Sequence, residues 1–133
     1  MAWQRAGCSA DGAECALVID VTDGNGSTVS HNVSPFLAPK GMRLPKANVT
    51  ATVGPWSPST RGGVPITVQT TATALFVVLT TQAPGRFSDN GFLIERGETR
   101  TVEFVAWAPL DAAAVALLKG SLRVEHLADN LSA

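Results

Sequence analysis

The sequence predicts an all-β protein, an antiparallel β-sandwich of seven to eight short strands with one short helical insert before the last strand. Three observations predict this fold class. Several runs alternate apolar and polar residues, which is the period of a half-buried strand. These runs are rich in β-branched residues, which favour strands. Gly, Pro, Asn and Asp, which favour turns, separate the runs at short intervals.

Length and composition indicate one folded domain. The chain has 133 residues, of which 45% are hydrophobic and 16% are charged, and these values exclude a disordered tail. A net charge of −1 gives no electrostatic basis for binding nucleic acid or an anionic membrane. No apolar run approaches the ~18 residues that indicate a membrane-spanning helix. We expect a lead-in segment at residues 1–13, the sandwich domain at residues 14–129 and a tail at residues 130–133.

The N-terminal half begins with a predicted hairpin. Residues 15–21 and 27–36 are expected to pair on either side of Asp23-Gly24-Asn25-Gly26, a strong turn signal. Residues 46–53 alternate apolar and polar side chains and should form the next strand, followed by a surface loop at residues 54–63. Residues 64–73 and 75–81 should also be strands. Five consecutive apolar residues at 75–79 predict that the second of these is covered on both faces.

A second hairpin is predicted at residues 87–107. Two apolar-rich runs, 87–94 and 99–107, flank residues 95–98, where Gly97 can adopt the positive φ of a tight turn. Asn90-Gly91 is a competing turn signal, but the later turn leaves two full-length strands. Asp111 is then expected to cap a helix at residues 112–119 that ends at Gly120, and residues 121–127 should form the last strand.

Cysteine and asparagine usage bears on the cellular compartment. Cys8 and Cys15 are the only cysteines, and they are either two free thiols or a local disulfide. We favour the disulfide, because two ligands cannot complete a tetrahedral zinc site. Four of the five asparagines begin an N-x-S/T sequon for N-glycosylation, namely Asn25, Asn32, Asn48 and Asn130. These features indicate a secretory route, with any signal peptide upstream of this chain because the N-terminus lacks an apolar core.

The sequence shows no catalytic apparatus of its own. The carboxylates nearest the second predicted hairpin are Asp89, Glu95, Glu98 and Glu103. Two of them could supply the acid and nucleophile of a glycosidase, but their expected places are an exposed turn and the polar face of a strand. Asp89 is the better candidate for fixing a bend in the backbone.

Other chemistries are no better supported. A triad of Ser88 with His31 or His126 lacks a nucleophile-elbow sequence, so we expect both histidines to be exposed or hydrogen-bonded structural residues. No metal-ligand spacing and no phosphate-binding loop occur, and no cofactor is expected.

Trp56 and Trp107 are the candidate sugar-stacking residues. Trp107 follows a strand, and we expect it to pack in the core or against a neighbouring domain. Trp56 lies in the Pro-rich loop, and we expect it to be the more exposed of the two. Packing or an interdomain contact is favoured over sugar binding at both positions.

One stretch resembles a known family. Residues 84–93, Pro-Gly-Arg-Phe-Ser-Asp-Asn-Gly-Phe-Leu, followed by a turn and Thr-Arg-Thr-Val, are similar to the C-terminal β-sandwich domain of β-mannosidases of glycoside hydrolase family 2. The animal, lysosomal type is the most similar, over roughly residues 8–128, although residues 54–63 and 112–118 depart from it. The central motif of this resemblance consists of Arg86, Phe87, Ser88, Asp89, Asn90 and Phe92.

The resemblance implies an immunoglobulin-like domain of a larger retaining exo-β-mannosidase. In that family the acid/base and nucleophile glutamates lie on an upstream TIM barrel, so no catalytic residue is carried over to this chain. The implied role is to pack on the remaining domains of the parent enzyme, in the lysosome or outside the cell. Cys8 and Cys15 fall where related enzymes carry a cysteine-bearing loop. An independent carbohydrate-binding or adhesion module is the alternative.

Overall fold

The computed structural model describes residues 10–57 and 62–131. It divides the chain into two compact units, residues 1–44 and residues 45–133, and each is described by itself. This division differs from the predicted boundaries, which placed residues 14–129 in one sandwich. The first two strands form a separate two-stranded sheet, because they hydrogen-bond to each other and belong to neither of the larger sheets.

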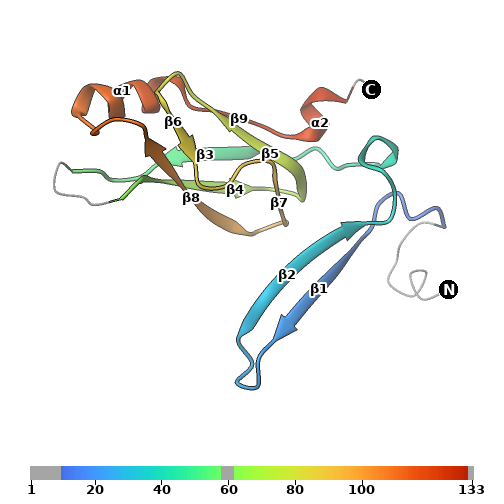
Figure 1. Ribbon diagram of the computed structural model, residues 1–133. Coiled ribbons are helices and arrows are strands. Elements are labelled where there is room, and N and C mark those ends of the chain that lie inside the picture. The colour runs from blue at the N-terminus through green and yellow to red at the C-terminus, as the bar shows by residue number, and fades with distance from the viewer. Residues whose placement is uncertain (1–9, 58–61, 132–133) are drawn as a thin grey trace. The chain divides into compact units, whose positions relative to one another are not determined.

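The first unit contains an antiparallel hairpin of β1 (Ala16–Thr22) and β2 (Thr28–Pro35), as Figure 1 shows. Its turn is built by Asp23, whose carboxylate accepts hydrogen bonds from the backbone N–H groups of Asn25 and Ser27, each at 2.9 Å. Gly26 supplies the positive φ of 82° that this turn requires. The predicted first hairpin is therefore confirmed.

Arg43 organises the rest of the first unit. Its guanidinium group donates to the carboxylates of Asp11 and Glu14, each at 2.9 Å, and these hydrogen bonds raise the pKa of Arg43 above its ordinary value. Its backbone N–H also donates to the carbonyl of Ala13 at 2.9 Å. The described end of the predicted lead-in is thus tied to the segment after β2, where Pro39–Gly41 forms a short 3₁₀ turn.

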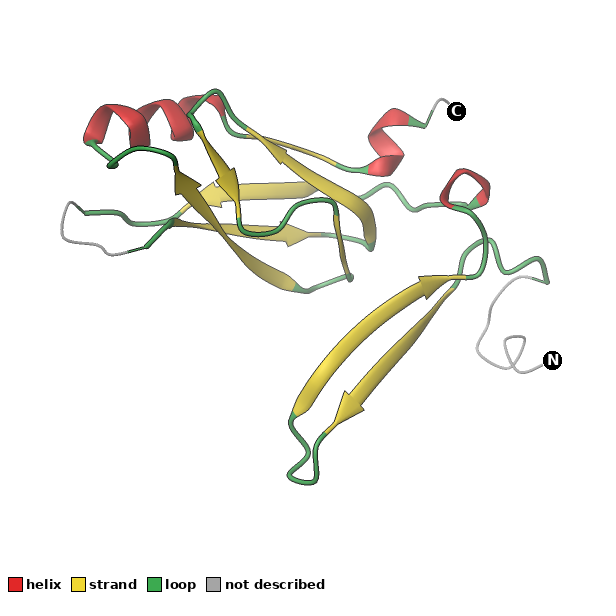
Figure 2. Ribbon diagram, in the orientation of Figure 1, coloured by secondary structure: helices red, strands yellow, loops and turns green. Residues whose placement is uncertain are grey.

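The second unit contains two antiparallel sheets, whose strands are yellow in Figure 2. The four-stranded sheet has the order β3 (Val49–Val53), β4 (Val64–Thr70), β8 (Thr99–Ala106) and β6 (Gly85–Phe87). The three-stranded sheet has the order β7 (Phe92–Ile94), β5 (Ala74–Thr80) and β9 (Arg123–Glu125). This arrangement confirms the predicted all-β, antiparallel fold class.

The core of the second unit lies between the sheets. Alternate residues of the strands point inward, as the sequence pattern predicts, and helix α1 (Ala112–Ser121) adds to them. The largest fully buried side chains are Phe104, Ile66, Leu79, Ile94, Leu118, Val64, Val68, Val77 and Val102. Burial of these apolar surfaces is the main free-energy gain of folding.

The second predicted hairpin is wrong. Residues 87–94 are not one strand: β6 pairs with β8, whereas β7 pairs with β5 in the other sheet. The predicted turn at Gly97 exists, with a φ of 79°, and the competing turn at Asn90-Gly91 exists as well, with a φ of 76° at Gly91. Each turn carries the chain from one sheet to the other. Turn chemistry fixes a local change of direction and leaves the choice of partner strand to tertiary packing.

The prediction that β5 is covered on both faces is also wrong. Its burial alternates, with Val77 and Leu79 buried and Phe76 and Val78 exposed by 48% and 38%. Phe76 has a φ of 52°, in the left-handed region that a bulky side chain rarely adopts. This residue lies at the irregularity between Ala74 and Val77 in the pairing with β7, as is typical of a β-bulge.

The C-terminal end differs from the prediction in two respects. Asp111 caps α1 as expected, accepting from the N–H of Ala114 at 2.7 Å, but the helix continues past Gly120 to Ser121. There the Ser121 hydroxyl donates to the carbonyl of Leu117 at 2.6 Å. The last strand is shorter than predicted, and the residues after it form a second helix, α2 (Leu127–Asn130). Among the described residues, no helix has the length and apolar character to cross a membrane.

Candidate functional site

The motif at residues 86–92 carries the chain from one sheet to the other. Its first residues belong to β6, where Phe87 pairs with Phe104 of β8 and their rings meet edge to face with centroids 5.6 Å apart. Ser88 extends this pairing: its N–H donates to the carbonyl of Glu103 at 2.7 Å, and its hydroxyl accepts from the N–H of Glu103 at 3.0 Å. The motif thus begins as the edge of the four-stranded sheet. The side chain of Arg86 is exposed there.

Asn90 fastens the crossing segment to the three-stranded sheet. Its side-chain oxygen accepts from the N–H of Leu79 at 2.7 Å, and its amide group donates to the carbonyl of Leu79 at 3.0 Å. Leu79 is a buried residue of β5, and the Asn90 amide makes the two hydrogen bonds to its backbone that a paired strand would otherwise make. Gly91 continues this attachment, because its N–H donates to the carbonyl of Val77 at 2.8 Å.

Asp89 and Arg100 form a second connection across the same segment. The Arg100 guanidinium lies 2.6 Å from the Asp89 carboxylate and donates to the carbonyl of Leu93 at 3.3 Å. It also lies over the ring of Phe92, 4.5 Å from the ring centroid. Because both charged side chains are more than a third exposed, we expect this ion pair to orient the loop and to contribute little to stability.

Replacing Asn90 with Ala should lower the free energy of unfolding by ~2 kcal/mol, because one N–H and one carbonyl of a buried strand lose their partner. Asn90→Asp, which keeps an acceptor but loses the donor, should have an intermediate effect. Urea unfolding followed by tryptophan fluorescence measures both. Asn48→Ala is the matched control, since the Asn48 side chain is exposed and its bond to Thr71 uses the backbone N–H, and it should change stability by less than ~0.5 kcal/mol. Equal effects of Asn90→Ala and Asn48→Ala would contradict the fastening role.

The carboxylates considered for catalysis make contacts within the fold or are exposed on a strand. Asp89 is paired with Arg100, and Glu98 accepts a hydrogen bond from the N–H of Glu95 at 2.9 Å within the turn after β7. Glu103 is exposed on β8. Within residues 10–57 and 62–131, no group of three or more His, Cys, Asp or Glu side chains could hold a metal ion.

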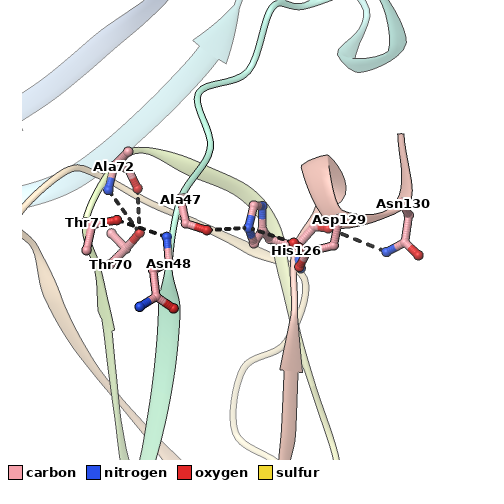
Figure 3. Close-up of polar contacts among 8 residues, drawn as sticks. All are labelled: Ala47, Asn48, Thr70, Thr71, Ala72, His126, Asp129 and Asn130. Atoms are coloured by element: carbon pink, nitrogen blue, oxygen red, sulfur yellow. Dashed lines mark hydrogen bonds and ion pairs between the residues drawn. The ribbon is translucent and has the colours of Figure 1, made fainter. Parts of the chain in front are cut away.

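The two histidines occupy different units and different environments. His31 lies on the exposed hairpin, with Nδ1 2.6 Å from the carboxylate of Asp20. His126 is only 4% exposed, and Figure 3 shows it between the start of β3 and helix α2. Its Nε2 lies 3.1 Å from the carbonyl of Ala47 and 3.3 Å from the carboxylate of Asp129, which also accepts from the His126 N–H. His126 therefore fixes the C-terminal helix to the four-stranded sheet, and the described part of the chain shows no hydrogen bond from Ser88 to a histidine.

The two tryptophans are exposed in the opposite order to the prediction. Trp56 is half-buried and packs against the core, whereas Trp107 is 75% exposed. Trp107 therefore does not pack in the core. Of the alternatives raised by the sequence, an interdomain contact and a ligand contact remain. A cavity of about 310 Å³ lies next to the same chain segment, and Trp107 itself does not line it; the lining residues are Trp56, Gly62, Val105, Ala106, Ala108, Pro109 and Leu110. Local sequence could not reveal this reversal, because exposure depends on which elements meet over each ring.

The four sequon asparagines all have exposed positions. Asn25 lies in the first turn and Asn32 on β2, whereas Asn48 precedes β3 and Asn130 ends α2. Cys15 is disulfide-bonded, whereas Cys8 lies outside the described residues, so the predicted pairing of these two stays a prediction.

Comparison with known proteins assigns the second unit to a family. A family model for an Ig-fold domain, Ig_mannosidase, matches residues 44–130, which is most of the chain. The chain belongs to this family. It is 41% identical over 101 residues to the β-mannosidase of goat (Capra hircus), covering 74% of this chain and 10% of that protein. The β-mannosidase of cattle (Bos taurus) gives the same identity and coverage.

The family assignment confirms the resemblance seen in the sequence and the Ig fold of the second unit. The matched family region begins at residue 44, next to the boundary between the two units of the structure. The chain spans about a tenth of the length of these two β-mannosidases.

Proposed function

We propose that this chain is a non-catalytic Ig-fold domain of a retaining exo-β-mannosidase that hydrolyses terminal β-D-mannose residues. Its role is to pack on the remaining domains of the enzyme and to support the architecture around the active site, whose acid/base and nucleophile are supplied by another domain. The observation that carries this proposal is the structural role of the motif at residues 86–92, by which the sequence resembles β-mannosidases. Ser88, Asp89 and Asn90 all make polar contacts that hold the crossing segment to strands of the two sheets, which is a structural role.

The proposal predicts that the chain alone does not turn over substrate, whereas it can replace its counterpart in a relative. The purified chain should release no 4-nitrophenol from 4-nitrophenyl β-D-mannopyranoside above the blank. Goat β-mannosidase in which this entire chain replaces the aligned segment should fold and keep its kcat/KM within about tenfold, a change of ~1.4 kcal/mol. The same enzyme with the segment deleted is the control. Turnover by the chain alone, or a chimera as inactive as the deletion, would contradict the proposal.

A carbohydrate-binding module is the second candidate, and the exposed Trp107 favours it. Exposed aromatic rings present an apolar face on which a sugar ring can stack. Titration of the chain with mannose and manno-oligosaccharides, followed by tryptophan fluorescence, separates the two functions. Saturable binding favours the module, and no change in emission favours the architectural domain.

We also propose that the chain is made in the secretory pathway and acts in the lysosome or outside the cell. The four exposed sequons and the disulfide-bonded Cys15 support this, since N-glycans and disulfides form in that pathway. The intact mass of the chain secreted by a eukaryotic host, before and after enzymatic removal of N-glycans, tests it. An unchanged mass would argue against the proposal.

A further inference from the structure

Trp107 is the most exposed large hydrophobic residue among the described residues of the second unit, at 75%. It follows directly after β8, and its N–H donates to the carbonyl of Pro84 at 3.3 Å. A few residues later, Asp111 begins α1 with its side-chain cap. The segment that carries Trp107 is therefore held at both ends, so little conformational entropy remains to be lost when the side chain meets a partner.

A cavity lies next to the chain segment that carries Trp107, and none of its lining side chains is charged. Its large lining residues are Trp56, Val105, Pro109 and Leu110, and the remaining lining residues are Ala and Gly. We define these four residues together with Trp107 as the Trp107 surface. It contains no charged side chain, and its only side-chain hydrogen-bond donors are the two indole N–H groups. Its side chains therefore offer the hydroxyl groups of a sugar few hydrogen-bond partners, and the polar groups that line the cavity are mainly those of the backbone.

The Trp107 surface lies at the end of the four-stranded sheet that is opposite the sequons. The pairing of Val64 with Phe104 places the end of β8 beside the start of β4, and Asn48 precedes the other end of the sheet, where Val49 pairs with Thr70. Asn130 lies near Asn48, because the His126 ring that precedes its helix contacts Ala47 (Figure 3). Glycans on both sequons of this unit would leave the Trp107 surface uncovered.

We infer that the Trp107 surface docks on another domain of the same enzyme, with Trp107 as the anchor residue. This inference rests on the proposed function and specifies the contact that it requires. The chain covers 10% of the goat relative, so that relative contains ample further polypeptide to provide the partner. The partner is a protein surface with a pocket for the indole ring, because tryptophan is enriched among the anchor residues of protein interfaces.

The test compares Trp107→Ser in two settings. In the chimera of goat β-mannosidase that carries this entire chain, the substitution should speed irreversible thermal inactivation about 30-fold, as expected for loss of an anchor residue. In the isolated chain, the same substitution should leave the unfolding midpoint within about 1 °C, because the side chain has few contacts there. Val78→Thr is the matched control, since Val78 is exposed on the other sheet, and it should have little effect in either setting.

Four results would count against the inference. If the parent chimera is active and the Trp107→Ser chimera inactivates at the same rate, the docking surface is contradicted and the proposed function is not. A drop of several degrees in the isolated chain would show that Trp107 stabilises its own fold. Saturable manno-oligosaccharide binding that Trp107→Ser abolishes would assign the residue to a sugar. An unfolded parent chimera would count against both the docking surface and the proposed function.

Discussion

Replacing Phe104 with Ala should lower the free energy of unfolding by about 4 kcal/mol. Phe104 is fully buried at the centre of the second unit, and its ring contacts that of Phe87 on the neighbouring strand. Removing it loses the transfer free energy of the ring and opens a cavity that the paired strands cannot easily close. Urea unfolding, followed by tryptophan fluorescence, measures the change.

Phe76→Ala is the control for Phe104→Ala. It removes the same side chain from a residue that is 48% exposed and whose positive φ is as unfavourable for Ala as for Phe. The expected loss is below about 1 kcal/mol. Similar losses at both positions would show that the buried core is not centred where the structure places it.

Replacing Gly85 with Ala should destabilise the domain by about 3 kcal/mol. A Cβ atom at this position would collide with the ring of Phe104 and would lie 2.7 Å from the carbonyl oxygen of Val105. The ring cannot move aside because it is fully buried, and the Val105 carbonyl belongs to the paired strand. Strand β6 must therefore shift away from β8. Thermal and urea unfolding of the chain measure the cost.

The control for this substitution has the opposite expected sign. Gly120 lies in α1 with nothing near its missing Cβ, so Gly120→Ala should stabilise the chain by up to ~1 kcal/mol through helix propensity. Phe104→Leu should cost less stability in the Gly85→Ala background than in the parent chain, because it vacates the position with which the new Cβ collides. Equal costs in the two backgrounds would assign the effect of Gly85→Ala to the Val105 carbonyl alone.

The elements that sequence predicts best are those that local chemistry determines. The first hairpin follows from Asp23 and Gly26, and the cap of α1 follows from Asp111. The partner of each strand is not determined locally. Apolar residues in the segment 87–94 serve both sheets, and their alternation is the same whichever sheet they join.

The candidate site, too, could be predicted from the sequence only in part. Resemblance selected the motif that includes Asp89 and Asn90, but only coordinates show Asn90 bonded to both backbone groups of Leu79. Asn90-Gly91 is a competing turn signal that the sequence pattern does not favour, yet it does form a turn, and that turn joins two sheets. The exposure of Trp107 and the burial of His126 depend on neighbours far along the chain, and neither could be predicted from nearby residues.

The lengths of the outermost strands have a consequence for solubility. In the second unit, β3 and β6 border one sheet, and β7 and β9 border the other. Three of these strands, β6, β7 and β9, have only three residues each. So short a row of free backbone groups offers a poor template for a strand from another molecule. The unit should therefore resist aggregation into fibres through its edge strands.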